Sequence, residues 1–335
     1  MMARASFTIL AFLAACRAAP IPSDQRFPAG TPFRDEYRVV DGTRLRMVDT
    51  GRGAPVVFLH GFGASLYTWR KTLAPVAAQG YRVIAIDNRG FGFSDKPARG
   101  YGNAAYARLV VALLDSLGVS SAVLVGHSMG GAIAAEVALA HPDRVRGLVL
   151  IDGAGYGIRW PASLKLARWP VLGRVATALR GRWITGRLLR STYADPSRVT
   201  ERDVDQYYAP VPEADYGRAL RGVLREFRFD SLVGRLGAIE APTLVLWGAE
   251  DRWIPLSTGR RLASELPRAA FVVIPNAGHA SPDEAPDEVN RFLIAFLKEG
   301  LPRIPEDLAW SAPPFLPWSP SSSPSTRPTR PGSGS

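Results

Sequence analysis

Short, nearly continuous apolar runs alternate with helical patterns along most of the chain. The apolar runs have the length of strands buried on both faces, and they lie at residues 55–59, 81–86, 121–125, 146–151, 242–247 and 270–274. Apolar positions with helical spacing occur at residues 66–79, 106–117, 132–140, 257–266 and 286–298. Near the start, residues 36–40 and 43–48 flank Asp41-Gly42, a two-residue hairpin signal. This alternation predicts an α/β protein with a mostly parallel central sheet and helices on both faces.

The strand pattern lapses in the middle of the chain. Residues 154–235 contain helical pieces and no clear strand, and the alternation then resumes. We therefore expect residues 37–153 and 236–300 to form one α/β core. The intervening segment is predicted to be a helical cap over the carboxyl edge of the sheet, where ligands bind in such folds.

Residues 1–15 have the pattern of an export signal. Arg4 supplies a positive start, and residues 7–15 form an apolar stretch too short to span a bilayer. The stretch ends in Leu-Ala-Ala followed by Cys16, which resembles the lipobox of bacterial lipoproteins, whose cysteine becomes the lipidated first residue. We expect an exported protein held on a membrane of the bacterial cell envelope through Cys16. The alternative is an ordinary signal cleaved near Ala19, giving a secreted or periplasmic protein.

The segments that flank the predicted core have a different composition. Residues 16–36 contain four prolines and are predicted to be a tether, and residues 301–335 are rich in proline and serine and are predicted to be a disordered tail. For the whole chain, 47% hydrophobic and 21% charged residues indicate a packed globular core between these segments.

Charge and cysteine content exclude several function classes. The net charge is +11, but only four of the 41 basic residues are lysine, a skew typical of codon bias rather than of nucleic-acid binding. No nucleic-acid motif is present in the sequence. A single cysteine can form neither an intrachain disulfide nor a cysteine zinc cluster. No metal or dinucleotide motif occurs, so no cofactor is expected.

The pentapeptide Gly-x-Ser-x-Gly lies between a predicted buried strand and a predicted helix, with its serine at Ser128. A serine on such a sharp strand-to-helix turn holds its hydroxyl clear of the sheet, near the N–H groups of the new helix. Gly126 and Gly130 are required because a Cβ at either position would collide with the neighbouring element. The pattern predicts a nucleophile.

A serine hydroxyl needs a base, and histidine titrates in the right range. Of the four histidines, His127 adjoins Ser128, but adjacent side chains at this turn point apart. His60 belongs to a His-Gly motif, and His141 ends the following helix. His279 lies in the loop after the last predicted strand, from which it can reach the turn, so it is the predicted base.

The base needs a carboxylate to orient it. Asp87, Asp152 and Asp251 all lie at the ends of predicted strands. Asp251 gives the chain order Ser, Asp, His that is typical of α/β-hydrolases, and it is the predicted acid. Asp152 is the main alternative, and Glu250 is a weaker one.

Three motifs carry a resemblance to a known family. The chain has His-Gly at residues 60–61, Asp-x-Arg-Gly-x-Gly-x-Ser at 87–94 and Gly-x-Ser-x-Gly-Gly at 126–131. With the acid and base in order, the core resembles the cap-bearing serine hydrolases of the α/β-hydrolase superfamily. The resemblance implies that the backbone N–H groups of Phe62 and Met129 form the oxyanion hole.

The predicted chemistry is acyl transfer through an acyl-enzyme on Ser128, acting as a carboxylic-ester hydrolase of the esterase or lipase type. A serine nucleophile excludes the dehalogenases and epoxide hydrolases that resemble this fold but carry an aspartate. Hydrolases of C–C bonds in meta-cleavage products are the alternative, although Phe62 and His127 replace the small residues and asparagine usual there. Perhydrolysis would be a side reaction of the same triad, and a non-catalytic binding protein is a further alternative, less favoured because the triad is intact.

The cap has an unusual charge. Residues 156–194 carry eight basic side chains and no acidic one, together with Trp160, Trp169 and Trp183. Basic amphipathic helices with tryptophan are typical of membrane-surface elements, so the cap is predicted either to contact anionic lipid and admit lipid-like esters or to expose its arginines to water.

Overall fold

The computed structural model describes residues 33–158, 169, 173–174, 177 and 181–301. The signal peptide predicted at residues 1–15 and the lipidation site predicted at Cys16 lie outside this part of the chain. So does the tail predicted at residues 301–335, apart from Leu301.

The described residues form one eight-stranded sheet in the order β1-β2-β4-β3-β5-β6-β7-β8. The strands are β1 (Glu36–Val40), β2 (Thr43–Thr50), β3 (Pro55–Leu59), β4 (Arg82–Ile86), β5 (Ala122–His127), β6 (Val145–Ile151), β7 (Thr243–Gly248) and β8 (Ala269–Ile274). β2 is antiparallel to β1 and β4, and every other neighbouring pair is parallel. The predicted hairpin and the mostly parallel sheet are confirmed.

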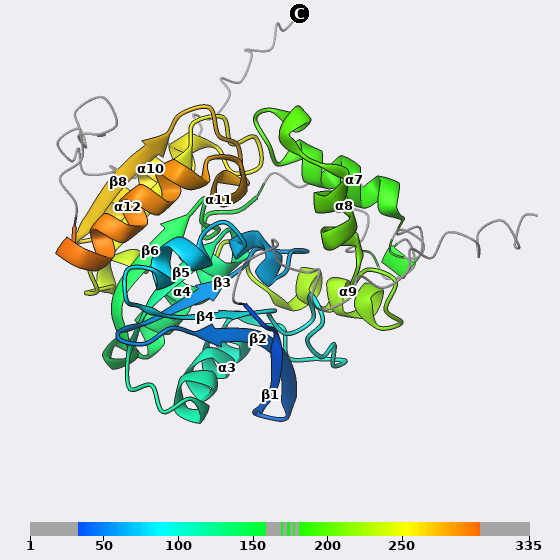
Figure 1. The fold of residues 1–335 in the computed structure, drawn as a ribbon, viewed down its shortest axis with the longest axis horizontal. Helices are drawn as coiled ribbons and strands as arrows, with labels where there is room; N and C mark the ends of the chain where they lie inside the picture. The colour runs from blue at the N-terminus through cyan, green and yellow to red at the C-terminus, as the bar shows by residue number, and fades with distance from the viewer. Residues whose placement is uncertain (1–32, 159–168, 170–172, 175–176, 178–180, 302–335) are drawn as a thin grey trace, which may run out of the picture.

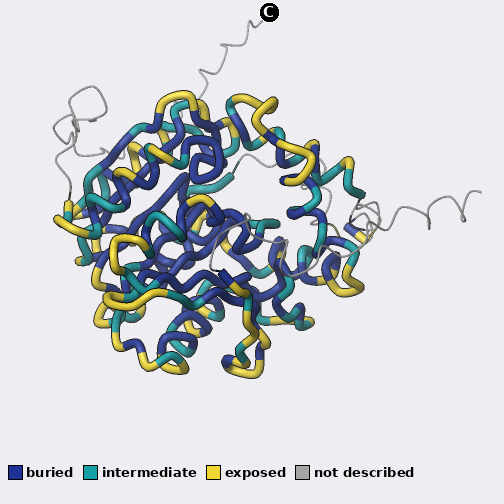
Figure 2. The backbone as a smooth tube through the Cα atoms, viewed as in Figure 1, coloured by how far each residue is buried: buried dark blue, intermediate teal, exposed yellow. Residues whose placement is uncertain are grey.

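Both faces of the sheet are covered by helices (Figure 1). The covering helices are α2 (Leu73–Ala77), α3 (Asn103–Ser116), α4 (Met129–Ala140), α10 (Leu256–Glu265) and α12 (Pro286–Glu299). Successive strand residues belong to opposite apolar clusters: Leu124 packs with α3 and α4, whereas Val125 packs with α2 and α12. The central strands are therefore buried on both faces (Figure 2), which explains their continuous apolar sequence.

One predicted helix is interrupted. The pattern at residues 66–79 predicts a single helix, but the chain forms a 3-10 turn, η2 (Leu66–Trp69), followed by the short α2. Pro75 has no backbone N–H, and in a continuous helix its ring would clash with the carbonyl of Lys71. The backbone therefore breaks between the two pieces.

The described residues of 154–235 contain helices and no strand. They form α7 (Arg182–Ser191), η4 (Pro196–Arg198), α8 (Glu201–Tyr208) and α9 (Tyr216–Glu226). In Figure 1, α7 and α8 lie to one side of the sheet, whereas the short α11 (Ser281–Glu284) lies next to the sheet. A hydrogen bond from the Ala280 N–H to the Thr192 carbonyl, at 3.1 Å, joins the end of α7 to the loop after β8.

Candidate active site

Ser128 lies on the sharp turn predicted between β5 and α4. Its φ is 52°, a left-handed conformation rare for serine. Its N–H donates to the Ile151 carbonyl at 3.0 Å, and its carbonyl accepts from the Ala154 N–H at 2.9 Å. The turn is thus held on both sides by the end of β6. Met129 is the first residue of α4, so its N–H belongs to the helical turn that lacks intrahelical acceptors.

The two glycines of the turn leave no room for a side chain. A Cβ on Gly126 would lie 2.3 Å from the Gly130 carbonyl oxygen, and a Cβ on Gly130 would lie 2.0 Å from the Leu59 carbonyl oxygen. Both neighbours are backbone atoms of packed elements and cannot move aside. The collision predicted from the sequence is confirmed.

We expect Gly130→Ala to lower the free energy of unfolding by about 3 kcal/mol or more, because the added methyl forces β3 and α4 apart. Gly181→Ala is the matched control, since a Cβ there meets nothing within 4 Å and the φ is −129°. Urea unfolding of both variants measures the difference. Equal midpoints for the two variants would contradict the packing described for the turn.

Ser128, His279 and Asp251 form a continuous hydrogen-bonded relay. Ser128 Oγ lies 2.9 Å from His279 Nε2, and His279 Nδ1 lies 2.8 Å from Asp251 Oδ2. All three residues are buried. Because the carboxylate accepts the Nδ1 proton, Nε2 is free to accept the proton of the serine hydroxyl. The fold brings together three residues that are 28 to 151 positions apart.

Both partners of the serine are held in place. The other oxygen of Asp251, Oδ1, accepts from the N–H groups of Trp253 and Ile254, each at 2.8 Å. The Trp253 indole stacks on the His279 ring, with centroids 5.8 Å apart and an interplanar angle of 6°. Trp253 was not recognised from the sequence, and its contact with His279 depends on the loop that follows β7.

The electrostatics favour a basic imidazole. Burial lowers the pKa of His279, but the charge of Asp251 and its hydrogen bond outweigh that cost, and the pKa stands above its ordinary value. The field of the neighbouring carboxylate thus favours the protonated form of the His279 imidazole.

The two alternative acids do not contact the imidazole. The Asp152 carboxyl accepts from the Gly248 N–H at 2.7 Å and bonds the Ser281 hydroxyl at 2.5 Å. Glu250 is exposed. Among the carboxylates considered from the sequence, that of Asp251 is the one that reaches His279 Nδ1.

The contacts of the Asp87 carboxylate are structural. Its oxygens accept from the Leu66 N–H and the Phe93 N–H, each at 2.7 Å, and from the Arg46 guanidinium at 3.2 Å. Asp87 therefore ties the start of η2 to the turn after β4. These bonds hold the loops beside the site in place.

The His-Gly loop lies against Ser128. A Cβ on Gly61 would be 3.1 Å from Ser128 Cβ. His60 Nε2 accepts from the Asn88 N–H at 2.8 Å, and the Asn88 side chain donates to the His60 carbonyl at 2.9 Å. The motif that contains Asn88 thus anchors the loop that carries Phe62, and this places the Phe62 segment beside Ser128.

His127 has a role that the sequence did not indicate. Its Nε2–H donates to the main-chain carbonyl of His279 at 2.7 Å, and the two rings lie 5.2 Å apart. Burial lowers the pKa of His127 to about 3, so the ring is neutral and cannot compete as a base at neutral pH. No local pattern signals this contact, because the two residues are 152 positions apart.

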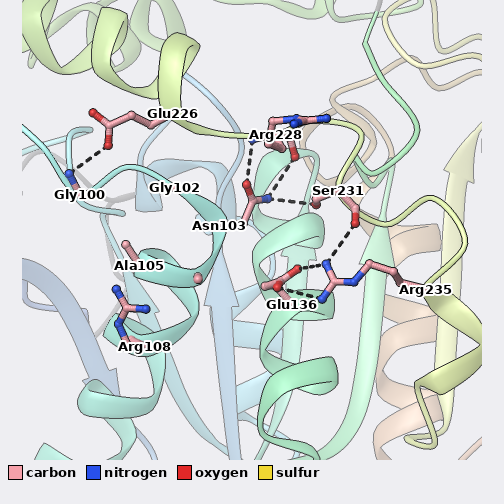
Figure 3. A pocket seen from close by; sticks show the side chains of 11 residues that line it. Gly100, Gly102, Asn103, Ala105, Arg108, Glu136, Glu226, Arg228, Ser231 and Arg235 are labelled. Atoms are coloured by element: carbon pink, nitrogen blue, oxygen red, sulfur yellow. Dashed lines mark hydrogen bonds and ion pairs between the residues drawn. The ribbon is translucent and has the colours of Figure 1, made fainter.

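A cavity of about 610 Å³ lies elsewhere, between the start of α3 and residues 226–235 (Figure 3). Its polar groups largely pair with one another: Asn103 bonds Arg228 and Ser231, and Arg235 pairs with Glu136. None of the lining residues belongs to the triad or to the loops that carry it. The cavity lies where residues 226–235 meet α3 and α4.

Within the described ranges, no group of three or more histidine, cysteine, aspartate or glutamate side chains is placed to hold a metal ion. No helix in the same part of the chain is both long and apolar enough to cross a bilayer.

Comparison with known proteins identifies the family. The family described as alpha/beta hydrolase fold matches residues 54–286. A 2-hydroxy-6-oxo-6-phenylhexa-2,4-dienoate hydrolase of Burkholderia cepacia is 32% identical over 267 residues, which cover 77% of this chain and 92% of that protein.

Solved structures agree with this match. A meta-cleavage product hydrolase from Pseudomonas fluorescens superposes with a TM-score of 0.70 at 27% identity, over 79% of this chain and 97% of that one. A membrane phospholipase A, described as a bacterial virulence factor, superposes with a TM-score of 0.68 at 30% identity, over 79% and 86% of the two chains. The chain belongs to the α/β hydrolase family.

Proposed function

We propose that this α/β hydrolase cleaves carboxylic esters through an acyl-enzyme on Ser128. The observation that carries the proposal is the buried relay from Ser128 through His279 to Asp251, with contacts of 2.9 and 2.8 Å. A non-catalytic binding protein would have no need for a hydroxyl, an imidazole and a carboxylate aligned in this order.

Each residue has one role in the proposed reaction. His279 Nε2 takes the hydroxyl proton as Ser128 Oγ attacks the ester carbonyl. The N–H groups of Phe62 and Met129 stabilise the oxyanion, and one such donor contributes ~3 kcal/mol. His279 then protonates the leaving alkoxide, and water repeats the sequence on the acyl-enzyme. Asp251 holds the imidazole in the required tautomer throughout.

A second candidate is hydrolysis of a C–C bond in a meta-cleavage product, because that activity is in the names of several relatives. The substrate in the first of these names is a dienoate, which carries a carboxylate, and a buried carboxylate needs a cationic partner.

The pairing of the buried cations favours an uncharged ester. Each buried arginine or lysine of the described residues is engaged within the protein: Arg46 with Asp35 and Asp87, Arg70 with Asp203 and Asp283, Arg89 with Thr43, and Lys96 with Glu213. Three of these four cations therefore have a carboxylate partner, whereas Arg89 is held by the neutral Thr43 hydroxyl and the Gly100 carbonyl.

A substrate panel separates the two reactions. We expect p-nitrophenyl esters, tested from acetate to palmitate, to be hydrolysed with burst kinetics, because an acyl-enzyme forms before water attacks. The dienoate named above is expected to be a poor substrate. Efficient dienoate cleavage without turnover of any ester would replace this proposal by the C–C reaction.

We further propose that the enzyme is exported and acts on lipid-like esters at a membrane of the bacterial cell envelope, to which a lipidated Cys16 anchors it. Two observations support this site of action. A relative at 30% identity is named a membrane phospholipase A. On α7, Trp183 is 71% exposed, and the exposed Arg187 lies over its ring at 5.6 Å.

The basic charge of the cap is partly neutralised. Arg182 pairs with Glu201 and Asp205, and Arg190 pairs with Glu201, so α8 supplies the acidic partners that residues 156–194 lack. The proposed lipid contact therefore depends on Trp183 and Arg187 rather than on every arginine of the segment.

Flotation with vesicles tests the contact independently of the anchor. With Cys16→Ser in place, we expect the protein to float with vesicles of phosphatidylglycerol and phosphatidylcholine. Adding Arg187→Glu should weaken binding by about tenfold or more, since each basic residue near such a surface contributes ~1 kcal/mol. Arg228→Glu, an exposed change outside α7, is the control. Equal flotation of the two variants would show that α7 does not provide the lipid contact.

A further inference from the structure

The Asp152 carboxyl joins the two loops that carry the acid and the base. One oxygen accepts from the N–H of Gly248, the last residue of β7, three positions before Asp251. The other oxygen bonds the hydroxyl of Ser281, the first residue of α11, two positions after His279. The Asp152 side chain, at the end of β6, thus contacts the stretch that carries Asp251 and the stretch that carries His279.

Asp152 is held firmly in this place. The side chain is fully buried, and its N–H donates to the Leu246 carbonyl at 3.0 Å. Its φ of 48° is a left-handed conformation that costs free energy for a residue with a side chain. In this strained conformation the Asp152 carboxyl reaches both loops.

The two loops also touch each other at this point. A Cβ on Gly248 would lie 2.2 Å from the Gly278 carbonyl oxygen, and the Glu250 N–H donates to the Ala277 carbonyl at 2.9 Å. Their backbones are therefore in direct contact, and a small shift of one loop is transmitted to the other. The distance between Asp251 and His279 depends on this junction.

We infer that Asp152 is a positioning residue for the proposed ester hydrolysis, which fixes Asp251 against His279 by bonding Gly248 and Ser281. The inference rests on the proposed function. It assigns Asp152 no contact with substrate, and it predicts that the two hydrogen bonds act together on the rate constant kcat rather than on KM.

The protonation state agrees with this role. Burial and the nearby charge of Asp251 raise the pKa of Asp152 above its ordinary value, while His279 acts in the opposite direction. The raised pKa favours the neutral acid form of Asp152, while Asp251 is the carboxylate that bonds the imidazole. Asparagine has the same shape as this neutral form, with an oxygen for the Gly248 N–H and an amide N–H for Ser281.

Three variants test the inference. Asp152→Asn should keep kcat at pH 7 within about threefold, because it preserves both hydrogen bonds. Asp152→Ala should lower kcat by about 100-fold with little change in KM, since loss of alignment acts on the chemical step. Ser281→Ala removes one bond and should lower kcat by up to about tenfold.

Coupling between the positions distinguishes positioning from loss of folding. In the Asp152→Ala background, Ser281→Ala should add less than about twofold, because the bond it removes is already absent. Rescue by the amide is the second measurement: Asp152→Asn should retain most of the kcat that Asp152→Ala loses, because it can keep the bonds to Gly248 and Ser281. Independent effects of Asp152→Ala and Ser281→Ala, or equal losses of kcat in Asp152→Asn and Asp152→Ala, would overturn the inference.

The rate of labelling by a fluorophosphonate provides a readout that needs no ester substrate. If the native enzyme is not labelled, the proposed function fails. If the native enzyme is labelled and Asp152→Ala is labelled equally fast, the positioning role fails while the proposed function stands. Circular dichroism of each variant checks that the chain is folded.

Discussion

Ser128→Ala is expected to reduce ester turnover by about a millionfold, to the level left by binding and the oxyanion hole alone. Without Oγ, the imidazole of His279 has no proton to accept and no bond can form to the substrate carbonyl. The same change should abolish labelling by a fluorophosphonate, which reports the nucleophile without any assumption about the natural substrate. Steady-state kinetics and intact mass measure the two effects.

The matched control is Ser264→Ala on α10, whose hydroxyl donates to the Arg261 carbonyl of its own helix. This variant should keep full turnover and full labelling. Labelling that persists in Ser128→Ala would show that another residue is the nucleophile, and the proposed mechanism would be abandoned.

Asp251→Asn should lower kcat by about 10⁴-fold. The Trp253 and Ile254 N–H groups require an acceptor, so the amide oxygen takes the place of Oδ1 and the amide N–H₂ faces His279. Nδ1 must then accept a hydrogen bond, and the ring proton moves to Nε2. In that tautomer the imidazole cannot take the proton of the serine hydroxyl.

The variant should also change the pH dependence. The charge of Asp251 raises the pKa of His279, so its loss should lower that pKa and move the acid limb of kcat/KM to lower pH. Glu250→Gln, at the exposed neighbouring position, should leave both the rate and the limb unchanged. A larger loss in Glu250→Gln than in Asp251→Asn would reverse the assignment of the acid.

The sheet could be predicted from local patterns because each central strand is buried on both faces. A strand such as β5 must then be apolar at nearly every position, and the helix that packs on it must present an apolar face. The continuous apolar run and the helical spacing can therefore both be recognised in the sequence. The interruption at Pro75 was also present in the sequence as a local signal, although the periodicity at residues 66–79 obscured it.

The three members of the relay could be proposed from the sequence because each lies at or just beyond a strand end in a motif of its own. Parallel strands place their carboxyl ends at one edge, so residues far apart in the chain converge there. Chain order could not by itself choose between Asp251 and Asp152, because both lie between Ser128 and His279 in the sequence. In the structure, Asp251 faces Nδ1 while Asp152 faces Gly248 and Ser281.

Local sequence was sufficient for the α/β class, the position of the nucleophilic turn and the order of the triad, since these depend on periodicity and on glycines whose neighbours leave no room for a Cβ. The side chains that support the site became evident only once the chain was folded. His127, Asp152 and Trp253 act through contacts across 26 to 152 positions. Such contacts depend on how neighbouring strand ends pack, and no local pattern encodes that packing.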